Sequence, residues 1–384
     1  MTSEIKSFED MNISTNILRG IFSHGWEFPS PIQQKIIVPI IKGKDTIAQA
    51  QSGTGKTGAF SIAGLQRIDW SIKKPQIIVI SPTRELALQT YNTALAIGGR
   101  QFTQSNTRCS YSIGGTSVTN DIQALKNNNI VFISATPGRI YDIISRKVVS
   151  FDNIKTVILD EADEMLSQGF TEQVHNILGV LPKTVQIALF SATMAPDVLE
   201  IAETFMKDPF KLLVDIEDVP VQSIKQFVIN MEEDDKLGVL MDLYEQVSIN
   251  QSIIFVNSKR KVEWLSKKMT LNNFTVSSIH SAMEKDQREG IMANFRNGKT
   301  RVLISTDLLA RGIDVHHISI VVNYDIPSNY ENYIHRIGRA GRYGRKGLTI
   351  NFVTPTDGEN LKGIETLYKI KIEELPEDFE KFLH

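Results

Sequence analysis

A short segment rich in glycine and hydroxyl side chains has the spacing of a phosphate-binding loop. Residues 50–57 fit the pattern G-x-x-x-x-G-K-[ST], with alanine in the first position. Such glycines let backbone N–H groups converge on phosphate oxygens, and a helix that begins there adds its positive end. Lys56 would reach the outer phosphates and the Thr57 hydroxyl would bind Mg²⁺. An ordinary turn is the alternative, but a predicted strand before the segment and a predicted helix after it favour a nucleoside triphosphate site. The candidate residues are Ala50, Gln51, Ser52, Gly53, Thr54, Gly55, Lys56 and Thr57.

A second chemical signal is the acidic sequence Asp-Glu-Ala-Asp at residues 160–163. On its own, such a sequence is typical of a charged turn. Here it follows a run of buried character at 156–159, so its carboxylates are expected beside the phosphate-binding loop. Asp160 would hold Mg²⁺ through water, and Glu161 would accept a proton from the water that attacks the γ-phosphate.

Short β-branched apolar runs indicate the elements that position these residues. Such runs are typical of strands buried on both faces, and helical segments between them, such as 85–96 and 286–295, predict parallel sheets wrapped by helices. Ligands bind such sheets beyond the carboxyl ends of the strands. The predicted strands are 45–49, 76–80, 130–133, 156–159 and 186–190 in the first half, and 226–229, 252–256, 275–279, 301–304, 319–322 and 348–353 in the second.

The acidic, proline-containing stretch 214–222 is the best candidate for a domain boundary. We predict an α/β domain over 1–215, a linker over 216–222 and a second α/β domain over 223–384. The acidic stretch 232–235 is interpreted as a solvated turn.

The composition excludes several classes of protein. The 42 Lys and Arg oppose 44 Asp and Glu for a net charge of −2, which excludes a histone-like basic coat but leaves room for a local basic groove. The single cysteine, Cys109, excludes an internal disulfide framework and a cysteine-rich zinc site. Neither a membrane span nor a signal peptide is predicted, so the expected location is the cytoplasm, with the nucleus as the alternative.

The motifs together resemble those of the DEAD-box RNA helicases of helicase superfamily two. The individual motifs are short, but their shared order over almost the whole chain is specific. They are Phe8 with 25–33, 50–57, 82–87, Gly114 and Gly115, 136–139, 160–163, 191–193, 255–258, 305–314 and 335–342. Within the family the chain is most similar to the eukaryotic initiation factor four-A subfamily. The nuclear exon-junction relative of that subfamily is so similar that these motifs do not separate the two.

The resemblance implies two RecA-like parallel-sheet domains in tandem, with ATP and Mg²⁺ as cofactors. Gln33 would read adenine, which suits an amide that offers both a donor and an acceptor. Trp26 would stack on the base although the family usually has Phe or Tyr there, and Asp314 would bind the ribose. Phe8 fits either the adenine site or a core position. Arg339 and Arg342 would stabilise the charge that develops on the phosphates.

Two further groups of residues follow from the resemblance. The coupling residues are Asp163, Ser191, Thr193 and His335, with an ordinary structural histidine as the alternative for the last. The RNA-binding residues are Pro82, Thr83, Arg84, Gly114, Gly115, Thr136, Arg139, Arg288 and Thr306. Lys285 stands where the family usually has Gln, which places one contact in doubt. Contacts of this kind to phosphate and sugar predict salt-sensitive binding of single-stranded RNA without sequence preference.

The expected activity is ATP hydrolysis on closure of the two domains, with local separation of short RNA duplexes in translation initiation. An ATP-gated RNA clamp with little turnover is the alternative, and a P-loop kinase or transporter ATPase would fit the phosphate loop alone. The expected partners are RNA and a scaffold protein of the translation-initiation or exon-junction kind, and the chain is expected to be a monomer.

Overall fold

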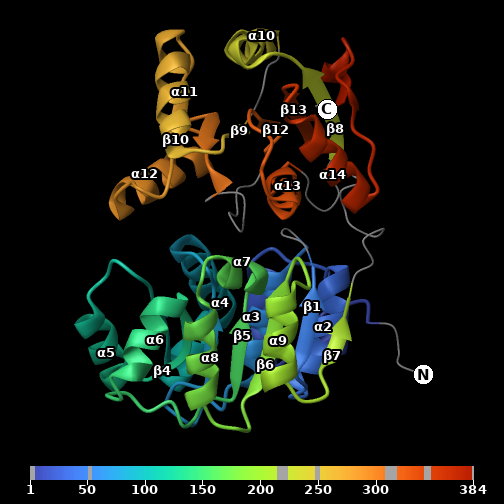
Figure 1. The fold of residues 1–384 in the computed structure, drawn as a ribbon. Coiled ribbons are helices and arrows are strands. Elements are labelled where there is room, and N and C mark those ends of the chain that lie inside the picture. Colours follow the sequence, from blue (N-terminus) through green and yellow to red (C-terminus); the bar gives the residue numbers. More distant parts are fainter. Residues whose placement is uncertain are drawn as a thin grey trace. The chain divides into compact units, whose positions relative to one another are not determined.

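The structure is a computed structural model that describes residues 5–50, 54–213, 224–246, 251–307, 318–340 and 347–382, apart from the side chains of Lys285 and Glu331. These residues divide into two compact units, which we call the N-terminal unit (5–50 and 54–213) and the C-terminal unit (224–382) (Figure 1). The predicted linker 216–222 and the boundary at 215 lie outside the described residues and stay predictions.

One seven-stranded sheet, parallel throughout, forms the centre of the N-terminal unit. Its middle strands are buried on both faces: Ile77 and Val79 point into one core cluster, and Ile78 and Ile80 into the other. The order across the sheet is β3 (Arg108–Ser112), β4 (Ile130–Ala135), β2 (Ile77–Ile80), β5 (Thr156–Leu159), β6 (Gln186–Ser191), β1 (Thr46–Gln49) and β7 (Phe210–Leu212).

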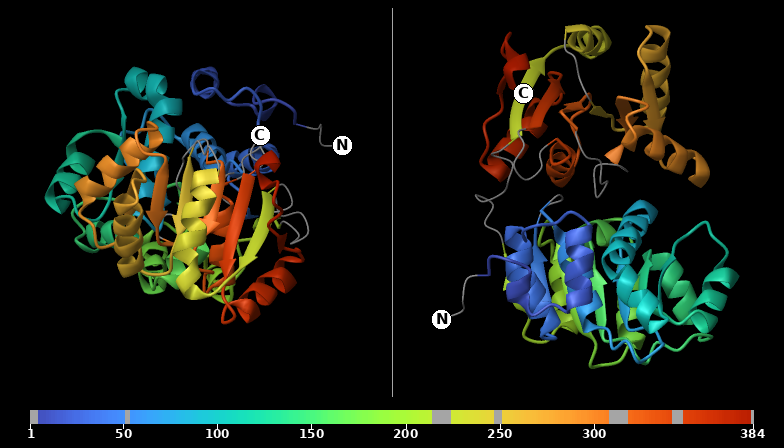
Figure 2. Two further views of the ribbon diagram at one scale, coloured as in Figure 1. Left: turned by 90° about the horizontal axis from the view of Figure 1, so that it is seen from above. Right: turned by 180° about the vertical axis from the view of Figure 1, so that it is seen from behind.

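Helices cover both faces of this sheet, as the view from the front (Figure 1) and the view from behind (Figure 2) show. Each face therefore has an apolar core of its own. The first core is formed with α1 (Thr15–Ser23), α2 (Pro31–Ile41), α3 (Lys56–Arg67) and α4 (Arg84–Ser105). The second is formed with α5 (Val118–Asn127), α6 (Pro137–Ser145), α7 (Ala162–Ser167), α8 (Thr171–Val180) and α9 (Pro196–Phe205).

The C-terminal unit repeats this plan with a second parallel sheet of seven strands. The order is β10 (Val276–Ile279), β11 (Val302–Ser305), β9 (Ser252–Phe255), β12 (Ile320–Asn323), β13 (Gly347–Val353), β8 (Ile224–Asn230) and β14 (Glu373–Glu374). One face packs with α12 (Lys285–Arg296), α13 (Tyr330–Ile337) and α14 (Gly358–Tyr368). The other packs with α10 (Lys236–Gln246), α11 (Lys259–Leu271) and the short 3-10 helix Phe379–Phe382.

The predicted fold class is confirmed, and every predicted strand corresponds to an observed one. The strands that the sequence pattern missed are β3, β7 and β14, and all three lie at sheet edges. An edge strand has one neighbour and is only partly buried, so it lacks the continuous apolar run that marked the others. The sequence of β3, Arg-Cys-Ser-Tyr-Ser, is an example.

Strand order decides which loops meet. The neighbours β5, β6 and β1 place the segments after Leu159, Ser191 and Gln49 at one edge of the N-terminal sheet. The neighbours β3, β4 and β2 gather a second set of loop ends at the same edge. In the C-terminal unit, the neighbours β11, β9 and β12 likewise place the segments that follow them at one edge of their sheet.

Candidate nucleotide and RNA sites

The phosphate-binding loop leads from β1 into α3, as the sequence predicted. Ala50 extends the sheet, since its N–H donates to Ser191 O at 2.9 Å. Gly55 precedes the first residue of α3 with a φ of 102°, a conformation that glycine adopts without strain. Lys56 and Thr57 form the first turn of that helix. Gln51, Ser52 and Gly53 lie outside the described residues, and their contacts with phosphate stay predictions.

Lys56 and Glu161 form a buried ion pair at the start of α3. Their side chains are 5% and 2% exposed, and Lys56 Nζ lies 2.9 Å from Glu161 Oε1. The same ammonium group donates to Ala50 O at 2.9 Å. Lys56, which is predicted to bind phosphate, and Glu161, which is predicted to accept a proton, are therefore in contact beside the loop.

Asp160 is buried at the end of β5 and differs from its neighbour. Its Oδ1 atom has no hydrogen-bond partner among the described residues. Burial, and next the repulsion from Glu161, raise the pKa of Asp160 to about 7. A divalent cation would satisfy this oxygen and favour the ionised carboxylate, so the residue fits the Mg²⁺ role predicted for it. Within the described residues no three His, Cys, Asp or Glu side chains gather into a metal site, so Mg²⁺ would also need Thr57, water and phosphate oxygens as ligands.

The segment that contains Trp26 and Gln33 packs directly against the loop. Gln33 closes a capping box at the start of α2, where its Oε1 accepts from Ser30 N at 2.9 Å. Its Nε2 donates to Gly55 O at 3.2 Å, and Ser30 Oγ donates to Thr54 O at 2.8 Å. The amide predicted to read adenine thus also ties α2 to the phosphate loop, and it is 5% exposed.

Trp26 and Phe8 have different surroundings. A Cβ atom at Gly58 would lie 2.7 Å from Trp26 Cη2 and 2.6 Å from Gln33 Nε2, so the half-buried indole sits against the first turn of α3. Phe8 is 0% exposed and belongs to the core of the N-terminal unit. Of the two interpretations of Phe8, its surroundings favour the core position, and a contact with adenine stays a prediction.

The predicted coupling residues of the N-terminal unit meet one another. Asp163 Oδ2 accepts from Thr193 N at 3.2 Å and from Thr193 Oγ1 at 3.1 Å. Asp163 N donates to Ser191 Oγ at 3.3 Å. These bonds join the acidic segment after β5 to the segment after β6.

Three of the predicted RNA-binding residues gather at the ends of β2 and β3. Gly115 has a φ of 83°, and a Cβ atom there would lie 2.7 Å from Arg84 Nη1. A Cβ atom at Gly114 would lie 3.3 Å from Arg84 Nη2. The guanidinium of Arg84 therefore lies on a backbone that has no side chains. Thr83 caps α4 by accepting from Leu86 N at 3.3 Å, and Pro82 is buried before it.

Arg139 is bound within the protein instead of being directed outward. Its Nη1 donates to Asp121 Oδ2 at 2.6 Å and to Thr116 Oγ1 at 2.8 Å. Its Nη2 donates to Thr116 O at 2.7 Å. Thr136, which is 9% exposed, precedes the same helix. RNA binding by Arg139 stays a prediction, and its contacts indicate that it holds the loop after Gly115 in place.

The predicted site residues of the C-terminal unit are mostly buried. His335 and Arg339 lie at the end of α13 and beyond it, and Arg339 Nε donates to His335 O at 3.3 Å. Arg288 in α12 is 8% exposed, and Thr306, directly after β11, is half-buried. Asp314 and Arg342 lie outside the described residues, and their roles stay predictions.

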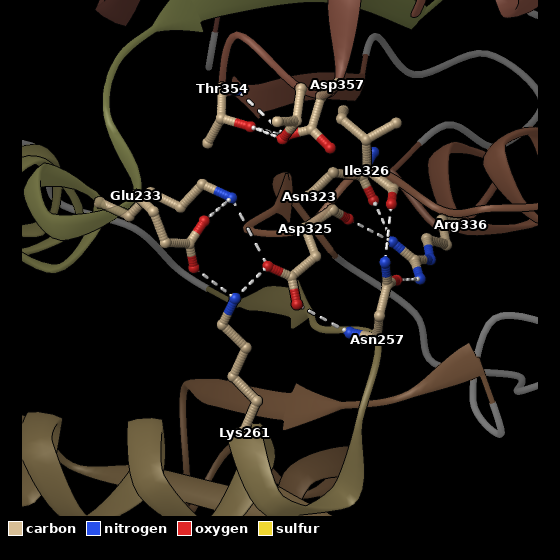
Figure 3. A network of polar contacts seen from close by, with 11 residues as sticks. Glu233, Asn257, Lys261, Asn323, Asp325, Ile326, Arg336, Thr354 and Asp357 are labelled. Atoms are coloured by element: carbon tan, nitrogen blue, oxygen red, sulfur yellow. Dashed lines mark hydrogen bonds and ion pairs between the residues drawn. The ribbon is translucent and has the colours of Figure 1, made fainter. Parts of the chain in front are cut away.

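A polar network around Arg336 was not predicted in detail (Figure 3). Arg336 is 0% exposed, and its guanidinium donates to Asp307 at 2.5 and 3.0 Å and to Asn257 Oδ1 at 2.8 Å. Asn257 N donates in turn to Asp325 Oδ2 at 2.9 Å. The sequence signal that could have indicated this network is an arginine together with polar residues at the ends of predicted strands.

Residues 232–235 are exposed and include the 3-10 helix Glu233–Asp235, in agreement with their interpretation as a solvated turn. Two ion pairs of Glu233 were not predicted: its carboxylate lies 2.6 Å from Lys261 Nζ and 2.8 Å from Lys236 Nζ. Lys261 also lies 2.5 Å from Asp325 Oδ1 (Figure 3). The sequence does not indicate these pairs, because folding brings both lysines to Glu233: one lies on the following helix and the other on α11.

No helix in the described part of the chain has the length and hydropathy that crossing a bilayer requires.

Comparison with known families gives two matches. A family described as DEAD/DEAH box helicase matches residues 30–201. A family described as helicase conserved C-terminal domain matches residues 235–344. The first range contains the phosphate loop and the acidic segment. The second range contains Arg336, Arg339 and Arg342.

Individual proteins resemble the chain over nearly its full length. A probable eukaryotic initiation factor 4A of Trypanosoma brucei brucei is 55% identical over 379 residues, which are 99% of this chain and 94% of that protein. An ATP-dependent RNA helicase eIF4A of Chaetomium globosum is 52% identical over 373 residues, 97% of this chain and 93% of that protein. Among solved structures, Saccharomyces cerevisiae Dbp5 bound to RNA and ADP BeF3 has a TM-score of 0.90 and 36% identity, covering 99% of each chain.

Proposed function

This chain belongs to the DEAD/DEAH box helicases and is an ATP-dependent RNA helicase, and from that premise we propose how its residues divide the work. The N-terminal unit binds ATP through the phosphate loop and the segment of Trp26 and Gln33. Single-stranded RNA lies across both units without sequence preference. Hydrolysis follows when the units close, and closure separates a short duplex locally.

The contact between Lys56 and Glu161 carries this proposal. A lysine for the outer phosphates and a carboxylate for the attacking water need to act on the same phosphoryl group. Their separation of 2.9 Å brings both groups to one point. Glu161 then accepts the proton of the attacking water, while Lys56 turns to the phosphates. Mg²⁺, held by Thr57 and Asp160, would neutralise charge on the phosphate oxygens.

The arginines of the C-terminal unit complete the site in this proposal. Arg339 and Arg342 stabilise the charge that develops as the γ-phosphate departs, a role that accelerates related reactions by about 10³–10⁵. The bonds of Asp163 with Ser191 and Thr193 support a link between hydrolysis and the loop ends that contact RNA. Because coupling free energies are reciprocal, RNA should tighten ATP binding as much as ATP tightens RNA binding.

The similarity to initiation factor 4A proteins supports a place in translation initiation, with a scaffold protein as partner and the cytoplasm as location. The chain is expected to act as a monomer on single-stranded or duplex RNA.

Steady-state ATP hydrolysis with and without a polyuridylate RNA tests the proposal, alongside release of one strand from a short duplex. We expect low turnover alone, strong stimulation by RNA and ATP-dependent strand release. High turnover that RNA does not change would refute the coupling. ATP-dependent RNA retention with negligible turnover would instead identify an RNA clamp.

A further inference from the structure

Helix α13 packs on its sheet through polar as well as apolar side chains. Tyr333, Arg336 and Ile337 share one face of the helix by their spacing, and each is 0% exposed. A helix usually packs on a sheet through apolar side chains, and two of these three are polar. Figure 3 shows the contacts of Arg336 with Asn257, Asn323 and Asp325. A second set of hydrogen bonds continues from Asn323 to Tyr333.

A row of hydrogen bonds crosses three neighbouring strands below α13. Tyr333 Oη donates to Gln226 Oε1 of β8 at 2.9 Å and accepts from Asn351 Nδ2 of β13 at 3.2 Å. Asn323 Nδ2 of β12 donates to Asn351 Oδ1 at 2.8 Å. Arg336 Nη1 of α13 donates to Asn323 Oδ1 at 3.3 Å, so the row begins and ends on the helix.

The two amides of this row are held firmly from both sides. Asn351 and Asn323 are each 0% exposed. Asn351 Nδ2 also donates to the backbone oxygen of Phe227 at 2.9 Å, which fixes the orientation of the amide. Water has no access to these groups, so each must find its partner within the protein.

Such a row defines the register of the helix. Apolar contact is non-directional, so an apolar helix face tolerates small shifts along a sheet. Hydrogen bonds weaken steeply when distance or angle departs from the optimum. A shift of α13 along the sheet would leave Tyr333, Arg336 and both asparagines buried without partners at once.

The register of α13 decides the place of the residues at its end. Arg339 N donates to Arg336 O at 3.1 Å and Gly338 N to Ile334 O at 2.9 Å, so the chain continues the helix to Arg339. His335 lies one turn earlier, and its backbone oxygen accepts from Arg339 Nε. A displacement of the helix is therefore passed on to Arg339.

We propose that Tyr333 and Asn351 are positioning residues for RNA-dependent ATP hydrolysis, which they support by fixing α13 on the sheet and so placing Arg339. This inference rests on the proposed role of Arg339 in stabilising the transition state. Neither residue is among those predicted to bind nucleotide. Both act on the rate at which bound ATP is hydrolysed, because Arg339 is needed at that step and the N-terminal unit supplies the ATP-binding loop.

The test uses the full chain with Tyr333→Phe, which removes one hydroxyl, and Asn351→Leu, which removes the amide at similar volume. Thr349→Val is the matched control, because Thr349 lies two residues before Asn351 on β13, is 0% exposed and has a hydroxyl without a partner in the described structure. For each variant, kcat and the KM values for ATP and polyuridylate are measured below its melting temperature.

We expect kcat to fall about five- to tenfold in both variants, with both KM values within about twofold of the parent. Thr349→Val should keep the parental kcat. Unchanged kcat in Tyr333→Phe would overturn the inference even if Asn351→Leu failed to fold. A rise in KM that accounts for the loss would overturn it too, since that result indicates general damage to the unit.

Arg339→Ala is measured in the same series. If it hydrolyses ATP at the parental rate, the proposed function fails, and the inference with it. If Arg339→Ala is slow while Tyr333→Phe is normal, the inference alone fails.

Discussion

Asp160 and Glu161 are adjacent buried carboxylates that differ in their close contacts. Glu161 has a cation at 2.9 Å, whereas Asp160 has a buried oxygen without a partner among the described residues and a pKa raised to about 7 by burial and by Glu161. Two titratable groups whose environments differ in this way usually have different chemical tasks. The pairing supports Glu161 as proton acceptor and Asp160 as metal ligand.

The raised pKa of Asp160 predicts how stability depends on pH when divalent cations and nucleotide are absent. Between the ordinary value of 3.8 and about 7, the folded protein keeps a proton that the unfolded chain releases. Its ionisation therefore lowers the free energy of unfolding as pH rises through this window. Asp160→Asn removes this loss, so the variant should gain stability relative to the parent from pH 4 to pH 7.

Denaturant unfolding of both proteins across this pH range, in the presence of a chelator, measures the difference. Groups that do not interact with Asp160 titrate alike in both proteins and cancel in the comparison. A stability difference that stays constant with pH would show that Asp160 keeps an ordinary pKa.

Glu161→Gln tests the proton acceptor while it preserves the shape of the side chain. We expect kcat for RNA-stimulated hydrolysis to fall by about 10²–10⁴, the usual contribution of general base catalysis. Binding of polyuridylate in the presence of ATP should persist, because the RNA-binding loops are untouched. Glu172→Gln, an exposed position on α8, is the control. Hydrolysis at more than a tenth of the parental rate would assign the base elsewhere.

Arg84 and Arg139 were both predicted to bind RNA, but their contacts differ. Arg84 lies on the bare backbone of Gly114 and Gly115, whereas Arg139 is held by Asp121 and Thr116. Removal of one phosphate contact to a single strand should lower the slope of log affinity against log salt by about 0.7. We therefore expect Arg84→Ala to reduce the slope and Arg139→Ala to weaken binding at an unchanged slope.

Fluorescence anisotropy with a labelled polyuridylate at several salt concentrations gives both slopes. Equal reductions in the two variants would show that Arg139 leaves Asp121 to contact a phosphate itself.

At the scale of elements, close packing joins α2 to the first turn of α3. Gln33 reaches Gly55 O and the Trp26 ring lies against Gly58, so the segment proposed to hold the base packs against the start of the helix that follows the proposed phosphate loop. An added methyl group at Gly58 would meet Gln33 Nε2 at 2.6 Å and Trp26 Cη2 at 2.7 Å, too close for either. The side chains of Gln33 and Trp26 would have to move away from α3.

Gly58→Ala should therefore raise the KM for ATP by about tenfold or more while leaving RNA binding without nucleotide unchanged. The control is Gly179→Ala on α8, where nothing lies within 4 Å of the added atom and alanine favours the helix. ATP binding is measured by titration with a fluorescent ATP analogue. A parental affinity in Gly58→Ala would mean that Trp26 and Gln33 do not need this packing.

Much of the fold was predictable because buried parallel strands have continuous apolar runs, as in 77–80 and 130–133. The phosphate loop and the acidic segment were predictable because both follow such strands. The partners of Arg139 and Glu233 were not, since Asp121 and Lys261 are brought to them only by folding. The row of hydrogen bonds under α13 has one indication in the sequence, which is Asn351 inside the apolar run 347–353.

At the scale of the whole molecule, two units with the same parallel-sheet plan follow each other in one chain. The N-terminal unit contains Lys56, Asp160 and Glu161, and the C-terminal unit contains Arg339. In the proposed function these residues form one catalytic set that is divided between two bodies, so hydrolysis depends on whatever holds the bodies together. RNA that binds both units is the natural candidate, so turnover should follow RNA occupancy.

The central claim is that one ATP is hydrolysed by groups from both units. The most direct measurement is the rate of RNA-stimulated hydrolysis by a variant with Arg339→Ala and Arg342→Ala, at ATP and polyuridylate concentrations that saturate the parent. We expect a loss of about 10³ or more in kcat, with ATP still bound by the N-terminal unit. Hydrolysis at the parental rate would contradict it.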